Sequence, residues 1–109
     1  MTIFLPPKIN VGGSDLNIEF PETLDDCQLG QTSIAEGFIR IANKYYTERG
    51  LLTQSDSSKE NTFYHELTHA ILGTMCNDMN NNEEFVSTFS SFLCSAMQQV
   101  VRLEFSKNE

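Results

Sequence analysis

Residues 64–69 read YHELTH, and this stretch holds the only two histidines of the 109-residue chain. On a helix, residues four apart lie on one face, about one turn from each other. His65 and His69 can therefore each point an imidazole nitrogen at one metal ion. Glu66 lies roughly 100° further round the helix. That offset keeps its carboxylate out of the ligand set but within reach of a water molecule beside the ion.

The flanks of this stretch predict a buried helix. Apolar residues cover much of its circumference, namely Phe63, Leu67, Ala70, Ile71, Leu72 and Met75. Buried imidazoles without partners are costly, so a metal site explains the two histidines better than a decorative role on a solvated face. The capping-box pattern from Ser57 to Glu60 predicts that the helix begins near residue 58. The asparagine-rich run 77–82 predicts its end near residue 77.

Upstream of the motif helix, the hydrophobic pattern predicts strands. Residues 16–20 read LNIEF and alternate strictly, as a half-buried strand does. We expect this strand to form a hairpin with residues 8–11 across the Gly-Gly turn at 12–15. Residues 21–35 are polar and predict an irregular loop.

A third strand is predicted directly after Gly37. Its members are Phe38, Ile39, Arg40, Ile41 and Ala42. Residues 43–57 then form a polar connection, with room for a short helical turn near 44–50. The strand region is therefore expected to span residues 1–42, with about three strands.

A last helix is predicted from residue 82 to residue 103 by the strongest helical periodicity in the chain. The apolar positions are Phe85, Val86, Phe89, Phe92, Leu93, Ala96, Met97, Val100 and Val101. We interpret this apolar stripe as a core face. The short connection before it lets the last helix fold back on the motif helix 58–77.

A catalytic zinc ion takes three protein ligands and leaves one position open. The chain has no third histidine, so the third ligand is a carboxylate or a cysteine. Glu83 lies three residues before Val86 and faces the same way as the apolar stripe, whereas Glu84 aligns with a row of serines. We favour Glu83 and keep Glu84 as the alternative. Asp78 is a more distant candidate, or an acceptor for a histidine N–H.

Composition narrows the functional classes. A chain of 109 residues predicts one domain spanning 1–109. Its net charge of −8 argues against nucleic acid or an anionic membrane as a partner. The three cysteines are widely spaced, which is typical of free thiols in a reducing compartment. The N-terminal residues do not resemble a signal peptide, so we expect a cytoplasmic protein of the producing or host cell.

Two segments together resemble a known family. HELTHAIL at 65–72, followed after a short connection by NEEFVSTFSSFL at 82–93, is similar to small gluzincin-like zinc metallopeptidases. The nearest of these are phage and mobile-element proteins of the ImmA/IrrE type and the single-domain minigluzincins. The resemblance is specific over residues 63–93 and only suggestive before them. In those families a glutamate just before the apolar part of the second helix is the third zinc ligand, which matches Glu83.

The resemblance implies an α+β, zincin-like domain. A small sheet would pack on the HExxH helix, and a long C-terminal helix would carry the ligand glutamate. The strand before the motif helix, Phe38–Ala42, would line the cleft and offer its edge to a peptide substrate. No tyrosine or histidine stands out as an oxyanion stabiliser. Tyr45 and Tyr46 are the only loop candidates, and packing is their more ordinary role.

The first functional hypothesis is a zinc metalloendopeptidase with one Zn²⁺ per chain, open or kept latent by its own tail or connection. His65, His69 and Glu83 would hold the ion, and Glu66 would activate water for attack on a peptide bond of a protein or peptide substrate. The alternative is a zinc-stabilised, non-catalytic interaction module, with a phage origin kept open. Glu66 favours catalysis, whereas a fourth ligand such as Cys76, Asp78 or the tail would favour the module.

Overall fold

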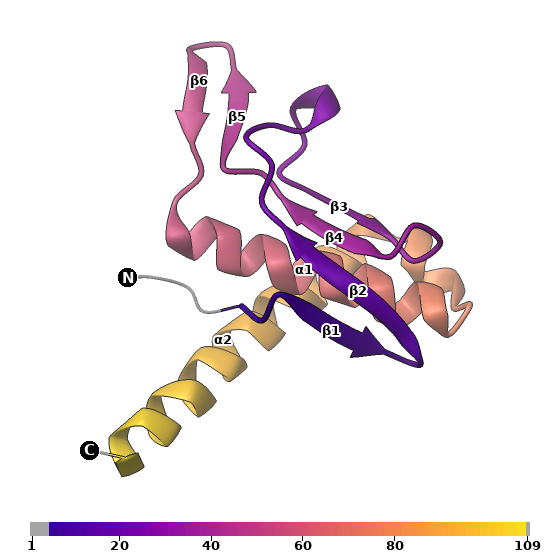
Figure 1. The fold of residues 1–109 in the computed structure, drawn as a ribbon, viewed down its shortest axis with the longest axis vertical. Coiled ribbons are helices and arrows are strands. Elements are labelled where there is room, and N and C mark those ends of the chain that lie inside the picture. Colours follow the sequence, from indigo (N-terminus) through magenta and orange to yellow (C-terminus); the bar gives the residue numbers. More distant parts are fainter. Residues whose placement is uncertain (1–4, 109) are drawn as a thin grey trace.

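The computed structural model describes residues 5–108 and their side chains as far as Val100. It confirms an α+β fold in which a mixed sheet packs against two helices (Figure 1). The strands are β1 (Lys8–Val11), β2 (Ser14–Glu19), β3 (Gly30–Ser33), β4 (Phe38–Ile41), β5 (Lys44–Thr47) and β6 (Gly50–Thr53). The helices are α1 (Asp56–Thr74) and α2 (Glu83–Asn108), and two short 3₁₀ turns are η1 (Asp25–Cys27) and η2 (Asp78–Asn81).

The main sheet has four strands in the order β1-β2-β4-β3. The predicted hairpin of β1 and β2 is confirmed, with Ile9 opposite Leu16 in an antiparallel register. β2 pairs with β4 in parallel, and β4 pairs with β3 in an antiparallel hairpin. β3 lies within the segment that was expected to be an irregular loop. Its sequence GQTS lacks the apolar alternation that marks a strand, so pairing with β4 and packing on α1 define it instead.

The expectation that Phe38–Ala42 offers a free edge is wrong. β4 is hydrogen-bonded to β2 on one side and to β3 on the other, so its backbone groups are already paired. Its apolar side chains are buried as well, as expected of a central strand. The strand at the edge of the sheet on this side is β3.

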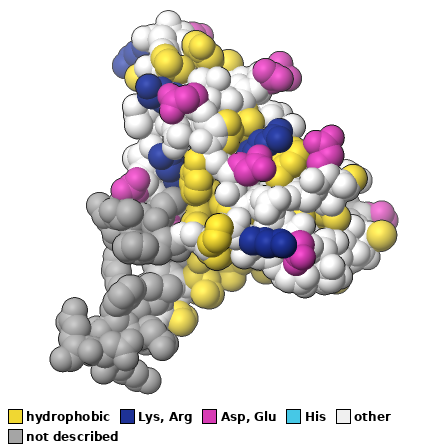
Figure 2. Space-filling model, in the orientation of Figure 1, with side chains coloured by type: hydrophobic (Ala, Val, Ile, Leu, Met, Phe, Trp, Pro, Cys, Tyr) yellow, Lys and Arg dark blue, Asp and Glu magenta, His cyan; other side chains and the backbone are white. Residues whose placement is uncertain are grey.

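The segment 43–57 is not an irregular connection. It contains a second, separate hairpin in which Tyr45 pairs with Leu52 and Tyr46 with Leu51. The doublets Tyr-Tyr and Leu-Leu break the alternation by which a strand is recognised in sequence. The hairpin stands off the main sheet (Figure 1), and hydrophobic side chains are visible over it at the top of Figure 2.

The core lies between the sheet and α1, which packs across β1, β3 and β4. Its buried members are Val11, Leu16, Ile18, Ile39, Ile41, Phe63 and Ala70. The N-cap of α1 is Ser55 and not Ser57, because the Ser55 hydroxyl accepts the backbone N–H of Ser58. The helix ends at Thr74, a few residues before the predicted end.

α2 begins at Glu83 and continues to Asn108, beyond the predicted end at residue 103. Only one face of its N-terminal half packs against α1, and the C-terminal half extends past the body of the molecule (Figure 1). Val86, Ser90 and Cys94 are buried, but Phe89 and Phe92 are 46% and 73% exposed. The interpretation of the whole apolar stripe as core is therefore wrong.

All three cysteines are free thiols, and Cys94 is buried whereas Cys27 and Cys76 are exposed. No helix in the described part of the chain is both long enough and apolar enough to cross a bilayer.

Gln54 joins the second hairpin to α1 through a buried polar network. Its side-chain amide donates to the carbonyl oxygen of Ala42 at 2.6 Å, and its side-chain oxygen accepts the hydroxyls of Ser58 and Thr62, both at 2.8 Å. Its backbone N–H donates to the carbonyl of Asn43 at 2.8 Å. One side chain therefore satisfies three polar groups where the hairpin meets α1.

We expect Gln54→Ala to lower the free energy of unfolding by about 2–4 kcal/mol, because buried groups lose their partners and a cavity remains. Chemical denaturation followed by circular dichroism measures this change. Thr53→Ala, at an exposed neighbouring position, is the control and should change stability by less than about 0.5 kcal/mol. Equal effects of the two substitutions would contradict the role assigned to Gln54.

Candidate metal centre

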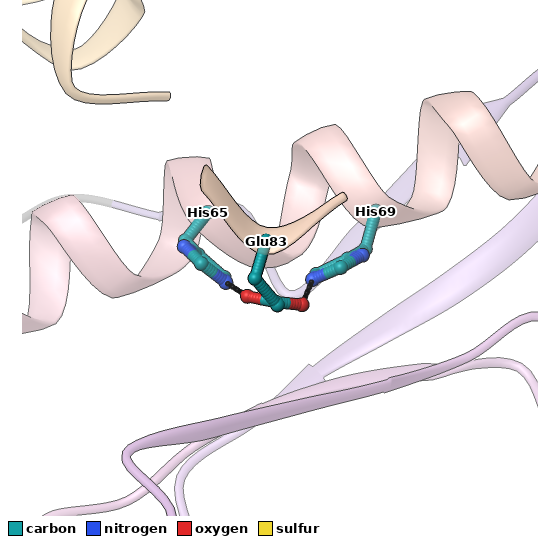
Figure 3. A group of neighbouring side chains, drawn as sticks. All are labelled: His65, His69 and Glu83. Atoms are coloured by element: carbon teal, nitrogen blue, oxygen red, sulfur yellow. Dashed lines mark ion pairs between the residues drawn. The ribbon is translucent and has the colours of Figure 1, made fainter. Parts of the chain in front are cut away.

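The two histidines of α1 meet the first residue of α2. His65 Nε2 lies 3.3 Å from Glu83 Oε2, and His69 Nε2 lies 2.9 Å from Glu83 Oε1 (Figure 3). One ligand atom from each residue falls within 4.8 Å of the others. In the described part of the chain this is the one cluster of histidine, cysteine or acidic residues so arranged.

The other candidate ligands lie outside this cluster. Glu84 is exposed on α2 and does not contribute to it, although it neighbours Glu83 in sequence. Asp78 and Cys76, both exposed, do not join it either. Within the described residues the candidate centre therefore offers three protein ligand atoms, two of them nitrogen and one oxygen.

Asn80, which the sequence interpretation overlooked, orients one of the histidines. Its side-chain oxygen lies 2.7 Å from His69 Nδ1. An amide oxygen can only accept a hydrogen bond, so Nδ1 carries the proton and donates it. Nε2, the other ring nitrogen of His69, faces Glu83 Oε1 at 2.9 Å. A proton on Nδ1 is what a metal ligand bound through Nε2 requires.

The asparagine-rich connection positions the whole centre. The Asn77 side chain accepts the N–H of Met79 at 2.9 Å and caps η2, while Asn82 accepts the N–H of Phe85 at 3.0 Å at the start of α2. Asn80 lies between these two caps and reaches His69. In sequence the run looks like an ordinary polar connection, and nothing within it distinguishes Asn80 from its neighbours. Only the fold shows that three of its asparagines make different structural hydrogen bonds.

Glu66 lies beside the centre and is buried, with 8% of its surface exposed. The Thr32 hydroxyl on β3 lies 2.7 Å from Glu66 Oε1 and 3.1 Å from the Glu66 carbonyl oxygen. Burial raises the pKa of Glu66, although the hydrogen bond from Thr32 and the two nearby histidines oppose this rise. The result is a fixed, poorly solvated carboxylate, which has the character of a proton acceptor.

A glycine on β3 permits this close packing. A Cβ atom at Gly30 would lie 2.6 Å from Thr62 Cγ2 and 2.8 Å from Glu66 Cγ, both closer than van der Waals contact allows. β3 therefore approaches α1 at the turn that carries Glu66 because position 30 has no side chain.

The ligand cluster opens into a cavity of about 600 Å³ between β3 and α1. Besides the cluster and Glu66, its lining includes Gln28, Gln31 and Ile34 from β3 and its flanks and Gly73 from α1. Tyr45 and Tyr46 lie on the second hairpin and do not line it. The cavity is large enough for a few residues of a peptide or for a small molecule.

Comparisons with protein-family models, with curated proteins and with solved structures find no significant match for this chain.

Proposed function

We propose that the protein is a zinc-dependent metallopeptidase of the gluzincin type. The observation that carries this proposal is the convergence of His65, His69 and Glu83 beside the buried carboxylate of Glu66. Two imidazoles and one carboxylate are the ligands of many catalytic zinc sites, whereas structural sites use four closed ligands, mostly cysteines.

The donor set fits a zinc ion. Tetrahedral ligands about 2.0–2.1 Å from zinc stand roughly 3.4 Å from each other, and the histidine and glutamate atoms are already 2.9 and 3.3 Å apart. His69 is held in the required tautomer by Asn80. His65, His69 and Glu83 would hold the ion, which when bound supplies a Lewis acid that polarises the scissile carbonyl and makes water more acidic.

The remaining chemistry belongs to residues of the chain itself. Glu66 takes a proton from the attacking water and passes it to the leaving amine as the peptide bond breaks. Thr32 holds Glu66 Oε1 in place, and we assign the proton to the other oxygen, Oε2.

We assign the substrate-binding edge to β3. It is the edge strand of the sheet, and three of its residues, Gly30, Gln31 and Thr32, line the cavity that contains the ligand cluster. A peptide in extended conformation can pair with such an edge by backbone hydrogen bonds. The substrate class that follows is an extended segment of a peptide or protein.

The second candidate function is a zinc-stabilised interaction module without catalysis. It would require a fourth protein ligand in place of the open position. Within the described residues the cluster has three ligands and faces a cavity. This arrangement supports the catalytic interpretation over the structural one.

Metal content is the first test. We expect about one zinc ion per purified wild-type chain by elemental analysis, and less than about a tenth of that in Glu83→Ala. The matched control is Glu84→Ala, which changes the adjacent, exposed carboxylate and should retain its zinc. Wild-type protein that binds no zinc even after reconstitution would refute the metal site. Zinc loss in both variants would refute the choice of Glu83.

Catalysis is tested with Glu66→Gln, which keeps the size of the side chain and an acceptor for Thr32 but removes the base. We expect zinc content to stay the same and peptide cleavage to fall by a factor of about 10² to 10⁴. Mass spectrometry of a mixed peptide library incubated with each protein gives the readout. Wild-type activity in the variant would exclude Glu66 as the base. Zinc-loaded wild type that cleaves nothing would favour the module.

Asn80 should affect the affinity for zinc although it is not itself a ligand. We expect Asn80→Ala to weaken zinc binding by about 10- to 100-fold, because His69 loses the partner that fixes its tautomer and ring orientation. Competition against a chromophoric chelator measures this affinity. Asn81→Ala, at the exposed next position, is the control and should bind zinc like the wild type. Unchanged affinity in Asn80→Ala would show that the hydrogen bond has no such role.

A further inference from the structure

α2 carries two apolar faces, only one of which is covered. The covered face contains Val86, Ser90 and Cys94, which lie against α1. The second face, here called the phenylalanine stripe, consists of Phe85, Phe89, Phe92, Ala96 and Val100. With 3.6 residues per turn, the stripe falls within an arc of roughly 80°, centred about 120° away from the covered face. It therefore forms a separate surface along the helix.

This stripe is exposed to water in the single chain. Phe89, Phe92 and Val100 are 46%, 73% and 53% exposed, and Ala96 is exposed between them. The rings of Phe85 and Phe89 stack with their centroids 5.7 Å apart, so the side chains lie together rather than scattered. The remaining face of the helix is a row of serine, threonine and glutamine residues. An ordered apolar row of this kind commonly marks a binding surface.

The charge pattern indicates what kind of partner fits. The chain has a net charge of −8, yet residues 85–101 contain no charged residue at all. Two copies of so acidic a chain repel each other wherever their carboxylates face, and this helix is a surface where they can approach without that cost. Helices that lie on membranes carry lysine and arginine on their polar face, whereas here that face is neutral. The pattern thus favours a protein surface over a lipid surface.

The exposed apolar area of the stripe is a large part of what a dimer needs. A standard interface buries about 800 Å² per partner, somewhat more than half of it apolar, hence on the order of 500 Å². At about 150–250 Å² for a whole aromatic side chain, the exposed parts of Phe89, Phe92 and Val100 contribute roughly 300 Å². Phe85 and Ala96, the other members of the stripe, add to this area.

We propose that α2 binds α2 of a second copy of this chain, antiparallel across a two-fold axis between Phe92 and Ala96. The steps of four, three and four residues from Phe85 to Ala96 are those of a coiled-coil seam. In the antiparallel pair the large Phe92 of one copy lies over the small Ala96 of the other, and the reverse, so that the surface is complementary to itself. The ligand cluster involves the opposite, α1-facing side of the helix, which leaves the cavity of each copy uncovered by this contact.

The test is the molar mass of the full chain in solution, measured by sedimentation equilibrium over a wide concentration range. A reducing agent is present, because Cys27 and Cys76 are exposed and could cross-link. We expect twice the chain mass at tens of micromolar for the wild type. Phe92→Glu places a charge in the seam and should weaken dimerisation by at least about 100-fold. Phe92 is 73% exposed in the single chain, so this variant should still fold, as circular dichroism can verify.

Ser91→Glu is the matched control, since it adds the same charge one residue away on the polar face. It should dimerise within about threefold of the wild type. A wild-type chain that stays monomeric up to about a millimolar would overturn the proposal and leave the stripe to a different protein or a membrane. A wild-type dimer that persists in Phe92→Glu would overturn it as well, because the interface would then lie elsewhere. Neither outcome depends on the zinc content or on peptidase activity.

Discussion

The contact of one carboxylate with two imidazoles ties the two helices together. Glu83 is the first residue of α2, and through it that helix meets His65 and His69 in the middle of α1. Each of these groups is polar and two are partly buried, so each needs a partner that compensates its desolvation. The fold brings two imidazole nitrogens and one carboxylate, a candidate set of metal ligands, to one point.

The connection between the helices achieves this with neutral side chains. Asn77 and Asn82 cap the two elements that follow them, and Asn80 between them holds His69. A carboxylate in the position of Asn80 would raise the basicity of the imidazole further. An amide fixes the tautomer without adding another negative charge to a centre that already contains Glu66 and Glu83. The amide of Asn80 therefore orients the His69 ring without changing the charge of the candidate centre.

Much of the candidate site could be predicted from sequence, because its residues lie close together along the chain. The spacing of His65 and His69 follows from helical periodicity, and the choice of Glu83 from periodicity together with the family resemblance. The errors arose where tertiary contacts decide. β3 has no strand pattern and approaches α1 because Gly30 has no side chain, so the edge that the resemblance placed at Phe38–Ala42 lies on β3 instead. The second hairpin was not predicted because residue doublets break its strand alternation. Asn80 was not predicted because nothing in the sequence distinguishes it from the neighbouring asparagines.

α2 shows why an apolar pattern does not reveal what covers it. Periodicity correctly predicted a helix, but it could not distinguish the face that packs on α1 from the face that α1 never reaches. A domain of this size has too few elements to enclose both sides of a helix as long as α2. When a helix has apolar residues over half its circumference, part of that apolar surface then stays exposed to water within one chain. The same element thus supplies a candidate metal ligand on one side and leaves a neutral, partly apolar surface exposed on the other.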